Sequence, residues 1–208
     1  MPNMTMEFRG IRHCISARLK EGSKMRNDVL WLSVTLLALG GACTSSYQQR
    51  ETTGVQASAF QLDSGKSVLV TVPADGSYGD RTYAGTGRTV AQKTAAAFSR
   101  YSRRVEVAAP EISKRDDLLA EARKIGAGYL VIPTVTHWEV RATEWSGIPS
   151  RVSISIAILD VATGRELRST LLESRSAVMT FVRPNPDALA EHMINENVSA
   201  LYVAKPQS

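Results

Sequence analysis

Residues 137–144 contain the side chains best suited to chemistry. His137 and Glu139 are two positions apart, so in an extended strand they lie on the same face and could together ligate a metal ion. A zinc site normally uses three or four protein ligands, and the remaining histidines, His13 and His192, are distant in the sequence. We therefore predict neither a metal site nor a cofactor.

A glycine-rich stretch, Gly85-Thr86-Gly87, could hold a phosphate against the N-terminus of the helix that follows it. The stretch lacks the third glycine of a dinucleotide fingerprint and the Gly-Lys-Ser/Thr of a P-loop. We therefore predict a turn-rich surface loop capped by Thr86 or Thr89. The sequence also has no Gly-x-Ser-x-Gly motif for a serine nucleophile, and we predict that the protein is not an enzyme.

The first 42 residues have the features of a leader. Met25 is followed by a basic residue, an apolar run from Val29 to Leu39 and the small residues Gly40-Gly41-Ala42. This order is typical of a secretory signal peptide, and the apolar run is shorter than the roughly 20 residues that cross a bilayer. We predict a leader over 1–42 with its true start at Met25. An extended basic region beginning at residue 1 is the alternative.

Cys43 comes directly after these small residues. The stretch Leu39-Gly40-Gly41-Ala42-Cys43 resembles the lipobox of bacterial lipoproteins, which implies cleavage before Cys43 and lipid attachment to its thiol. Stable anchoring needs more than one acyl chain, and the triacylated cysteine of such lipoproteins meets that need. In the enterobacterial sorting pattern of such lipoproteins, Asp after the cysteine retains the protein in the inner membrane. Residue 44 is Thr, so the resemblance implies an anchor in the outer membrane, facing the periplasm. An ordinary signal peptide with an incidental cysteine is the alternative.

Composition and charge exclude several classes of function. The chain has 208 residues, 43% of them apolar and 22% charged, as in globular proteins. The net charge of +5 falls to about +2 without the leader, which is too balanced for a nucleic-acid-binding face. The cysteines are Cys14 and Cys43, so the folded part has no disulfide framework.

The remaining sequence predicts one domain of the α/β (α+β) class. Residues 43–60 are polar and without periodicity, which indicates a flexible tether, and residues 61–204 form the domain. We expect a mixed sheet of about five strands with helices packed on it, in the order strand, helix, strand, helix, strand, strand, strand, helix. The strands are expected at 67–72, 105–107, 129–140, 151–159 and 166–176, and the helices at 89–101, 113–125 and 187–202.

Three of these elements carry particularly clear signals. Val152, Ile154, Ile156 and Ile158 alternate with small polar residues, as in a strand with one buried face. The turn 160–164 ends in a glycine and predicts a hairpin. Ser113 and Asp116 have the spacing of a capping box, and Asn185 or Asp187 is expected to cap the last helix.

Several stretches together resemble a bacterial lipoprotein family known as domain of unknown function 4823. They are Tyr78–Asp80, Tyr83–Gly87, Ala95–Tyr101, His137–Glu139 and Arg141–Pro149, and the resemblance extends over residues 60–203. The family has no assigned activity, so the resemblance implies an anchored lipoprotein domain and leaves its role open.

At the level of architecture the chain also resembles envelope domains such as the curli secretion lipoprotein, the lipoprotein activator of penicillin-binding proteins and the amino-terminal domain of the Tol-system protein B. This resemblance implies action by contact with other envelope components. Aromatic and arginine side chains often anchor contact surfaces, and the candidates here are Trp138, Glu139, Arg141, Glu144 and Trp145. A core role for both tryptophans is the alternative. The alternative function is a hydrolase of envelope glycans or lipids that uses Glu139 and Glu144.

Overall fold

The computed structural model describes residues 46–54, 61–110, 114–140, 149–176 and 185–202, all within the compact unit Cys43–Ser208. The elements are β1 (Ser46–Gly54), β2 (Val68–Val70), β3 (Ser77–Tyr78), β4 (Arg81–Thr82), α2 (Thr86–Phe98), β5 (Val105–Val107), α3 (Arg115–Lys124), β6 (Tyr129–Glu139), β7 (Arg151–Asp160), β8 (Glu166–Arg175) and α4 (Pro186–Tyr202).

The main sheet is mixed and has the strand order β1-β8-β7-β6-β2-β5. Strand β2 runs parallel to β5 and β6, whereas β6, β7, β8 and β1 are antiparallel to their neighbours. The parallel strands come from the first part of the chain, where helices connect them, and the antiparallel meander comes from the second part. The predicted fold class and order of elements are confirmed, with a sixth strand added and with a separate small hairpin of β3 and β4.

The sixth strand corrects the prediction of a flexible tether for residues 46–54, the part of the range 43–60 that the structure describes. Residues Ser46–Gly54 form β1, which pairs with β8 from Ser46 opposite Arg175 to Gly54 opposite Arg168. The sequence of β1 is polar because the strand lies at the sheet edge, where most of its side chains are exposed. Its stability comes from backbone hydrogen bonds to β8 and from an ion pair between Glu51 and Arg168.

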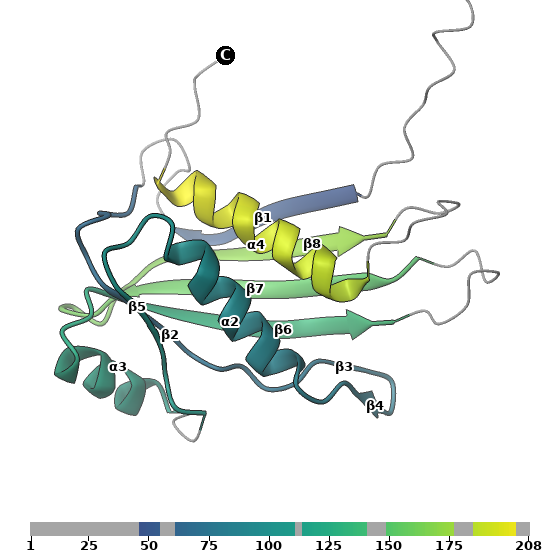
Figure 1. The fold of residues 1–208 in the computed structure, drawn as a ribbon, viewed down its shortest axis with the longest axis horizontal. Coiled ribbons are helices and arrows are strands. Elements are labelled where there is room, and N and C mark those ends of the chain that lie inside the picture. The colour runs from purple at the N-terminus through teal and green to yellow at the C-terminus, as the bar shows by residue number, and fades with distance from the viewer. Residues whose placement is uncertain (1–45, 55–60, 111–113, 141–148, 177–184, 203–208) are drawn as a thin grey trace, which may run out of the picture. The chain divides into compact units, whose positions relative to one another are not determined.

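Helices cover the sheet unequally, as Figure 1 shows. Helices α2 and α4 lie side by side on one face, where their apolar residues enclose the large core together with β2, β6, β7 and β8. Helix α3 covers the other face only beside β2 and β6, where Leu118 and Leu119 pack against Leu69, Leu130 and Leu159. The rest of that second face, over β7, β8 and β1, has no helix from the described part of the chain, and we call it the open face.

The alternation of β7 follows from this unequal cover. Val152, Ile154, Ile156 and Ile158 point toward α2 and α4 and are at most 2% exposed. Ser153, Ser155 and Ala157 alternate with them and point toward the other side of the sheet, where they are partly exposed. Ser153 and Ser155 lie on the open face, and Ala157 packs against the cluster beneath α3. The hairpin between β7 and β8 is confirmed. Its turn is held by the Asp160 carboxylate, whose Oδ1 accepts the Thr163 amide at 2.9 Å, and by the positive φ of 69° at Gly164.

The structure bears on two of the predicted helix starts, those of α4 and α3. Asn185 caps α4, since its Oδ1 accepts the backbone amide of Ala188 at 2.8 Å, as predicted. At α3 the N-cap residue is Lys114, with an extended backbone and no side-chain cap hydrogen bond. Ser113, the first residue of the predicted capping box, lies outside the described residues, whereas Asp116 is in the first turn, where its charge suits the helix dipole.

Candidate interaction surface

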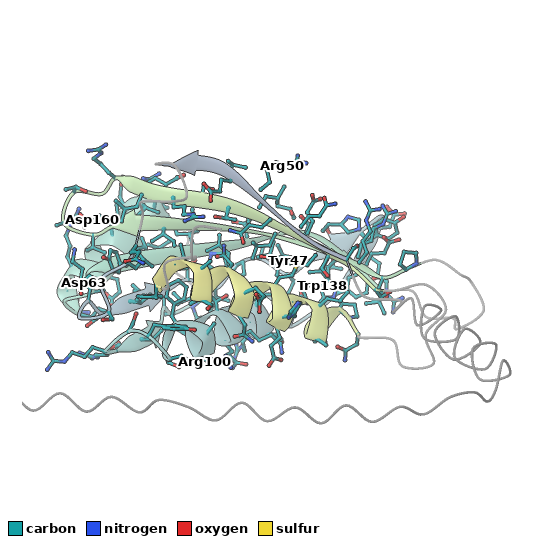
Figure 2. The ribbon with its side chains drawn as sticks, turned by 90° about the horizontal axis from the view of Figure 1, so that it is seen from above. Tyr47, Arg50, Asp63, Arg100, Trp138 and Asp160 are labelled. Atoms are coloured by element: carbon teal, nitrogen blue, oxygen red, sulfur yellow. The ribbon has the colours of Figure 1, made fainter. Side chains whose placement is uncertain are left out.

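Trp138 belongs to the core at the end of β6. Its side chain is 2% exposed and packs in the cluster under α2 and α4. The backbone of Gly76 lies so close that a Cβ at position 76 would be 2.6 Å from the Cβ of Trp138. Figure 2 places Trp138 toward one end of the sheet and Asp160 at the other. The expectation that Trp138 closes the core is confirmed.

Glu139, the next residue, is 3% exposed, and its Oε2 lies 3.2 Å from Nε2 of His137. The two residues therefore meet, as their spacing predicts. A register shift of β6 against β7 between Val135 and His137 precedes the pair, and this bulge bends the strand. Among the described residues, no third His, Cys, Asp or Glu joins this hydrogen-bonded pair.

The β3–β4 hairpin packs beside this end of β6. The ring of Tyr78 lies edge-on to the ring of His137, with centroids 5.1 Å apart. The Tyr83 hydroxyl accepts the backbone amide of Val140 at 3.4 Å, and the Arg81 guanidinium lies 5.3 Å from the Tyr83 ring centroid. The sequence predicts only a turn-rich loop here. Two strands of two residues each are too short for periodicity to reveal.

The N-terminus of α2 is held by a residue that the sequence analysis does not identify. The Asp75 carboxylate accepts the amides of Gly85 and Gly87, at 3.0 and 2.8 Å. The predicted cap by Thr86 or Thr89 is therefore wrong. The Thr86 hydroxyl accepts the Gly76 amide and donates to the Tyr83 carbonyl, and the Thr89 hydroxyl donates to the Gly85 carbonyl. The Asp75 carboxylate thus accepts the backbone amides of Gly85 and Gly87, which a phosphate at this helix N-terminus would need.

Four of the predicted site residues lie outside the described residues. They are Cys43, Arg141, Glu144 and Trp145. Of the predicted interaction surface, the structure places Trp138 and Glu139, and both are buried. The five residues are therefore not shown to meet in one surface.

The open face carries charged residues that the sequence analysis does not single out. Arg151 of β7 and Arg175 of β8 are direct cross-strand partners, and both are exposed. Beside them lies a hollow of about 250 Å³. Its lining residues are Thr136, His137, Arg151, Val152, Ser153, Glu173, Ser174 and Arg175. Within the described ranges, no helix is long and apolar enough to cross a membrane.

Comparisons with known proteins bear on the fold and the family. Among solved structures, the PelC dodecamer from Paraburkholderia phytofirmans has a TM-score of 0.58 at 18% identity, and the match covers 77% of this chain and 100% of the PelC chain. A single-residue variant of the same dodecamer has a TM-score of 0.57 at 18% identity, with 75% and 99% covered. Lipoprotein GNA1162 from Neisseria meningitidis has a TM-score of 0.41 at 19% identity, with 65% and 94% covered.

At these identities the likeness to PelC shows a shared fold and no more. No curated protein matches the sequence. A family model described as "Domain of unknown function (DUF4823)" matches residues 60–201. The resemblance found in the sequence is thereby confirmed, and this chain belongs to the DUF4823 family.

Proposed function

We propose that this chain is a lipoprotein of the cell envelope, held on the periplasmic side of the outer membrane by acylated Cys43, and that it acts by assembling with envelope components. The lipobox-like stretch ending at Cys43 supports the anchor. The protein is proposed to work through contact surfaces and without catalysis.

The observation that carries the assembly part is the likeness to PelC. The match spans the whole PelC chain, so this domain contains the complete PelC fold, and PelC forms a dodecamer. A fold that packs with copies of itself in one protein is suited to build oligomers in another. Fold likeness is analogy where function is concerned, and an experiment must decide whether this domain assembles.

The contact surface is proposed to include the segment that follows β6, with Trp145 as its anchor. Trp138, Glu139, Arg141, Glu144 and Trp145 supply the residue types common in such anchors. The burial of Trp138 assigns that tryptophan to the core and leaves Trp145 as the stronger candidate. Nothing in the described residues favours a hydrolase using Glu139 and Glu144, since Glu139 is buried and its carboxylate binds His137.

The anchor is tested by intact-mass measurement of the protein extracted from membranes. The expected mass is that of a chain beginning at Cys43 with acyl additions, and Cys43→Ser is expected to give an uncleaved or soluble product. An unmodified mass for the wild-type chain from the membrane fraction contradicts the anchor.

Assembly is tested by crosslinking in cells, followed by purification and native mass measurement. Trp145→Ala is expected to weaken partner capture by about 2 kcal/mol or more, as at interface anchors, with an unchanged thermal melt. The matched variant Trp138→Ala is expected to lower stability by about 3–5 kcal/mol, because it empties a buried site. A monomer without crosslinked partners, or capture unaffected by Trp145→Ala, argues against the proposed surface.

A further inference from the structure

Arg151 and Arg175 present two like charges side by side on the open face. They are direct partners in the β7–β8 register, and both side chains are exposed. Like charges opposite each other destabilise a pair of strands. Within the part of the chain that the structure describes, neither guanidinium takes part in an ion pair, and neither does the neighbouring carboxylate of Glu173. The arrangement therefore suits an anion from outside the chain.

The space beside the two arginines is large enough for such an anion. The hollow of about 250 Å³ is lined by both arginines, by the polar residues Thr136 and Ser153 and by Glu173, so two guanidinium groups face one carboxylate. A smaller hollow of about 100 Å³ shares Glu173 and Arg175 with the first and is otherwise lined by Ser46 and Gln48 of β1. Arginine guanidinium groups pair with phosphate oxygens through two parallel hydrogen bonds. A phosphate group is accordingly the ligand that this surface fits best.

The place of Cys43 in the sequence, three residues before β1, indicates that the phosphate belongs to a membrane lipid. Ser46, three residues after Cys43, is the direct partner of Arg175 in the β1–β8 register, so Ser46, Arg175 and Arg151 form one row across three strands. Glu139 of β6 is opposite Arg151 in the same row, and its carboxylate lies 3.2 Å from Nε2 of His137. Three residues span at most about 10 Å. If Cys43 carries acyl chains in the bilayer, Ser46 lies within about 10 Å of the point where the chain enters the lipid. Arg175 and Arg151 then lie about 5 and 10 Å further along the row, still close to the headgroups.

The same end of the sheet exposes apolar side chains. The strand ends of β6 and β8, the start of β1 and the β3–β4 hairpin lie together at this end (Figure 1). Tyr78 is 43% exposed and Val140 is 38% exposed. Tyrosine is enriched where proteins meet the membrane–water interface. The two arginines, the exposed apolar side chains and the short distance in sequence to Cys43 therefore all favour this end of the sheet as the one that meets the membrane.

We propose that Arg151 and Arg175 bind the phosphate groups of anionic phospholipids in the membrane that holds Cys43, so that this end of the sheet rests on the bilayer. The inference rests on the proposed anchoring at Cys43. It fixes the orientation of the domain: strands β6 to β8 stand on the membrane by this end, and the opposite end, with the β7–β8 turn at Asp160, points away.

The test uses the unit Cys43–Ser208 with Cys43→Ser, so that its outcome does not depend on acylation in cells. Co-sedimentation is measured with phosphatidylcholine vesicles that contain or lack phosphatidylglycerol. Arg151→Gln with Arg175→Gln is expected to lower partitioning onto the anionic vesicles by about five-fold per arginine. The matched control, Arg103→Gln with Arg165→Gln, removes two exposed charges at the other end and is expected to change it less than two-fold.

Two further arms make the outcome decisive. Arg151→Lys with Arg175→Lys is expected to bind anionic vesicles less well than the wild type and better than the Gln variant, because lysine keeps the charge and loses the paired hydrogen bonds. A thermal melt checks that each variant is folded. Inorganic phosphate at moderate concentration is expected to compete weakly, because a free ion lacks the many phosphates of a membrane surface. Equal losses in the Gln variant and the control, or full displacement by inorganic phosphate, overturn the proposal. An unacylated Cys43 in cells instead removes the proposed anchor and leaves the vesicle result standing.

Discussion

The Tyr47 ring of β1 lies edge-on against the His192 ring of α4, with centroids 6.0 Å apart and an interplanar angle of 65°. This contact joins the first strand to the last helix. Burial, and secondly the charge of Glu196, raise the pKa of Tyr47 to about 12. Its hydroxyl donates a hydrogen bond to Oε1 of Gln49 at 3.0 Å.

This raised pKa predicts a loss of stability in alkali. An unfolded tyrosine releases its proton near pH 10, whereas Tyr47 in the folded chain keeps its proton to about pH 12. Between these values the folded state binds more protons, so the free energy of unfolding falls as the pH rises. Because Tyr47 is only half-buried, we expect a loss of about 1–2 kcal/mol. The measurement is the denaturant midpoint against pH.

Tyr47→Phe supplies the comparison, because it removes the titrating hydroxyl and keeps the ring. Its alkaline loss should be smaller than that of the wild type. Burial also raises the pKa of Tyr202, so Tyr202→Phe is the parallel variant and should remove a separate part of the loss. Identical alkaline curves for Tyr47→Phe and the wild type contradict the prediction.

The ion pair between Glu51 and Arg168 is expected to hold β1 on the sheet. The Arg168 side chain is 4% exposed, so removing its partner leaves a buried charge. Glu51→Gln should lower the free energy of unfolding by about 1–3 kcal/mol, less than in a fully buried pair because Glu51 is 31% exposed. The double variant Glu51→Gln with Arg168→Met should lose less free energy of unfolding than the sum of the losses in the two single variants. Additive costs in denaturant melts argue against coupling.

Gly87→Ala is expected to destabilise the domain although alanine favours helices. A Cβ at position 87 would overlap the carbonyl oxygen of Pro73, and backbone cannot move aside as a side chain does. The overlap should outweigh the gain of helix propensity, roughly 1 kcal/mol, and leave a net loss of about 1–3 kcal/mol. Thermal melts test this against Arg88→Ala, an exposed neighbour in α2, whose change should stay within about 0.5 kcal/mol.

Ile156→Ala is expected to cost about 2–5 kcal/mol, because it leaves a cavity under α2 and α4. Ile156 is 1% exposed and belongs to the large core. Ser155→Ala, one residue earlier on the open face, should change the denaturant midpoint little. Similar midpoints for the two variants would mean that the faces of β7 are assigned the wrong way round.

The sequence is most informative where burial is one-sided. The alternation from Val152 to Ile158 predicts both the limits of β7 and its buried face, because α2 and α4 cover only one side of that strand. The cap at Asn185 is also predicted, since it depends on residues three positions apart.

Contacts between distant residues could not be predicted in the same way. Strand β1 exists because it pairs with β8, more than a hundred residues later, and its polar composition has no strand periodicity. The Asp75 cap of α2 and the Arg151–Arg175 pair likewise arise from chain segments brought together by folding. Single-sequence patterns report on local backbone and one-sided burial, and these features involve neither.

The pairing of β1 also determines how tension would enter the domain. Strand β1 starts at Ser46, opposite Arg175, and runs antiparallel to β8 along nearly its whole length. A pull on the chain at Ser46, directed away from that end of the sheet, acts along the strand axis and strains the β1–β8 hydrogen bonds together, in shear. Bonds strained together resist far more force than bonds opened one after another. If Cys43 is anchored as proposed, a pull on the anchor therefore reaches the rest of the fold through β1–β8 hydrogen bonds loaded in shear.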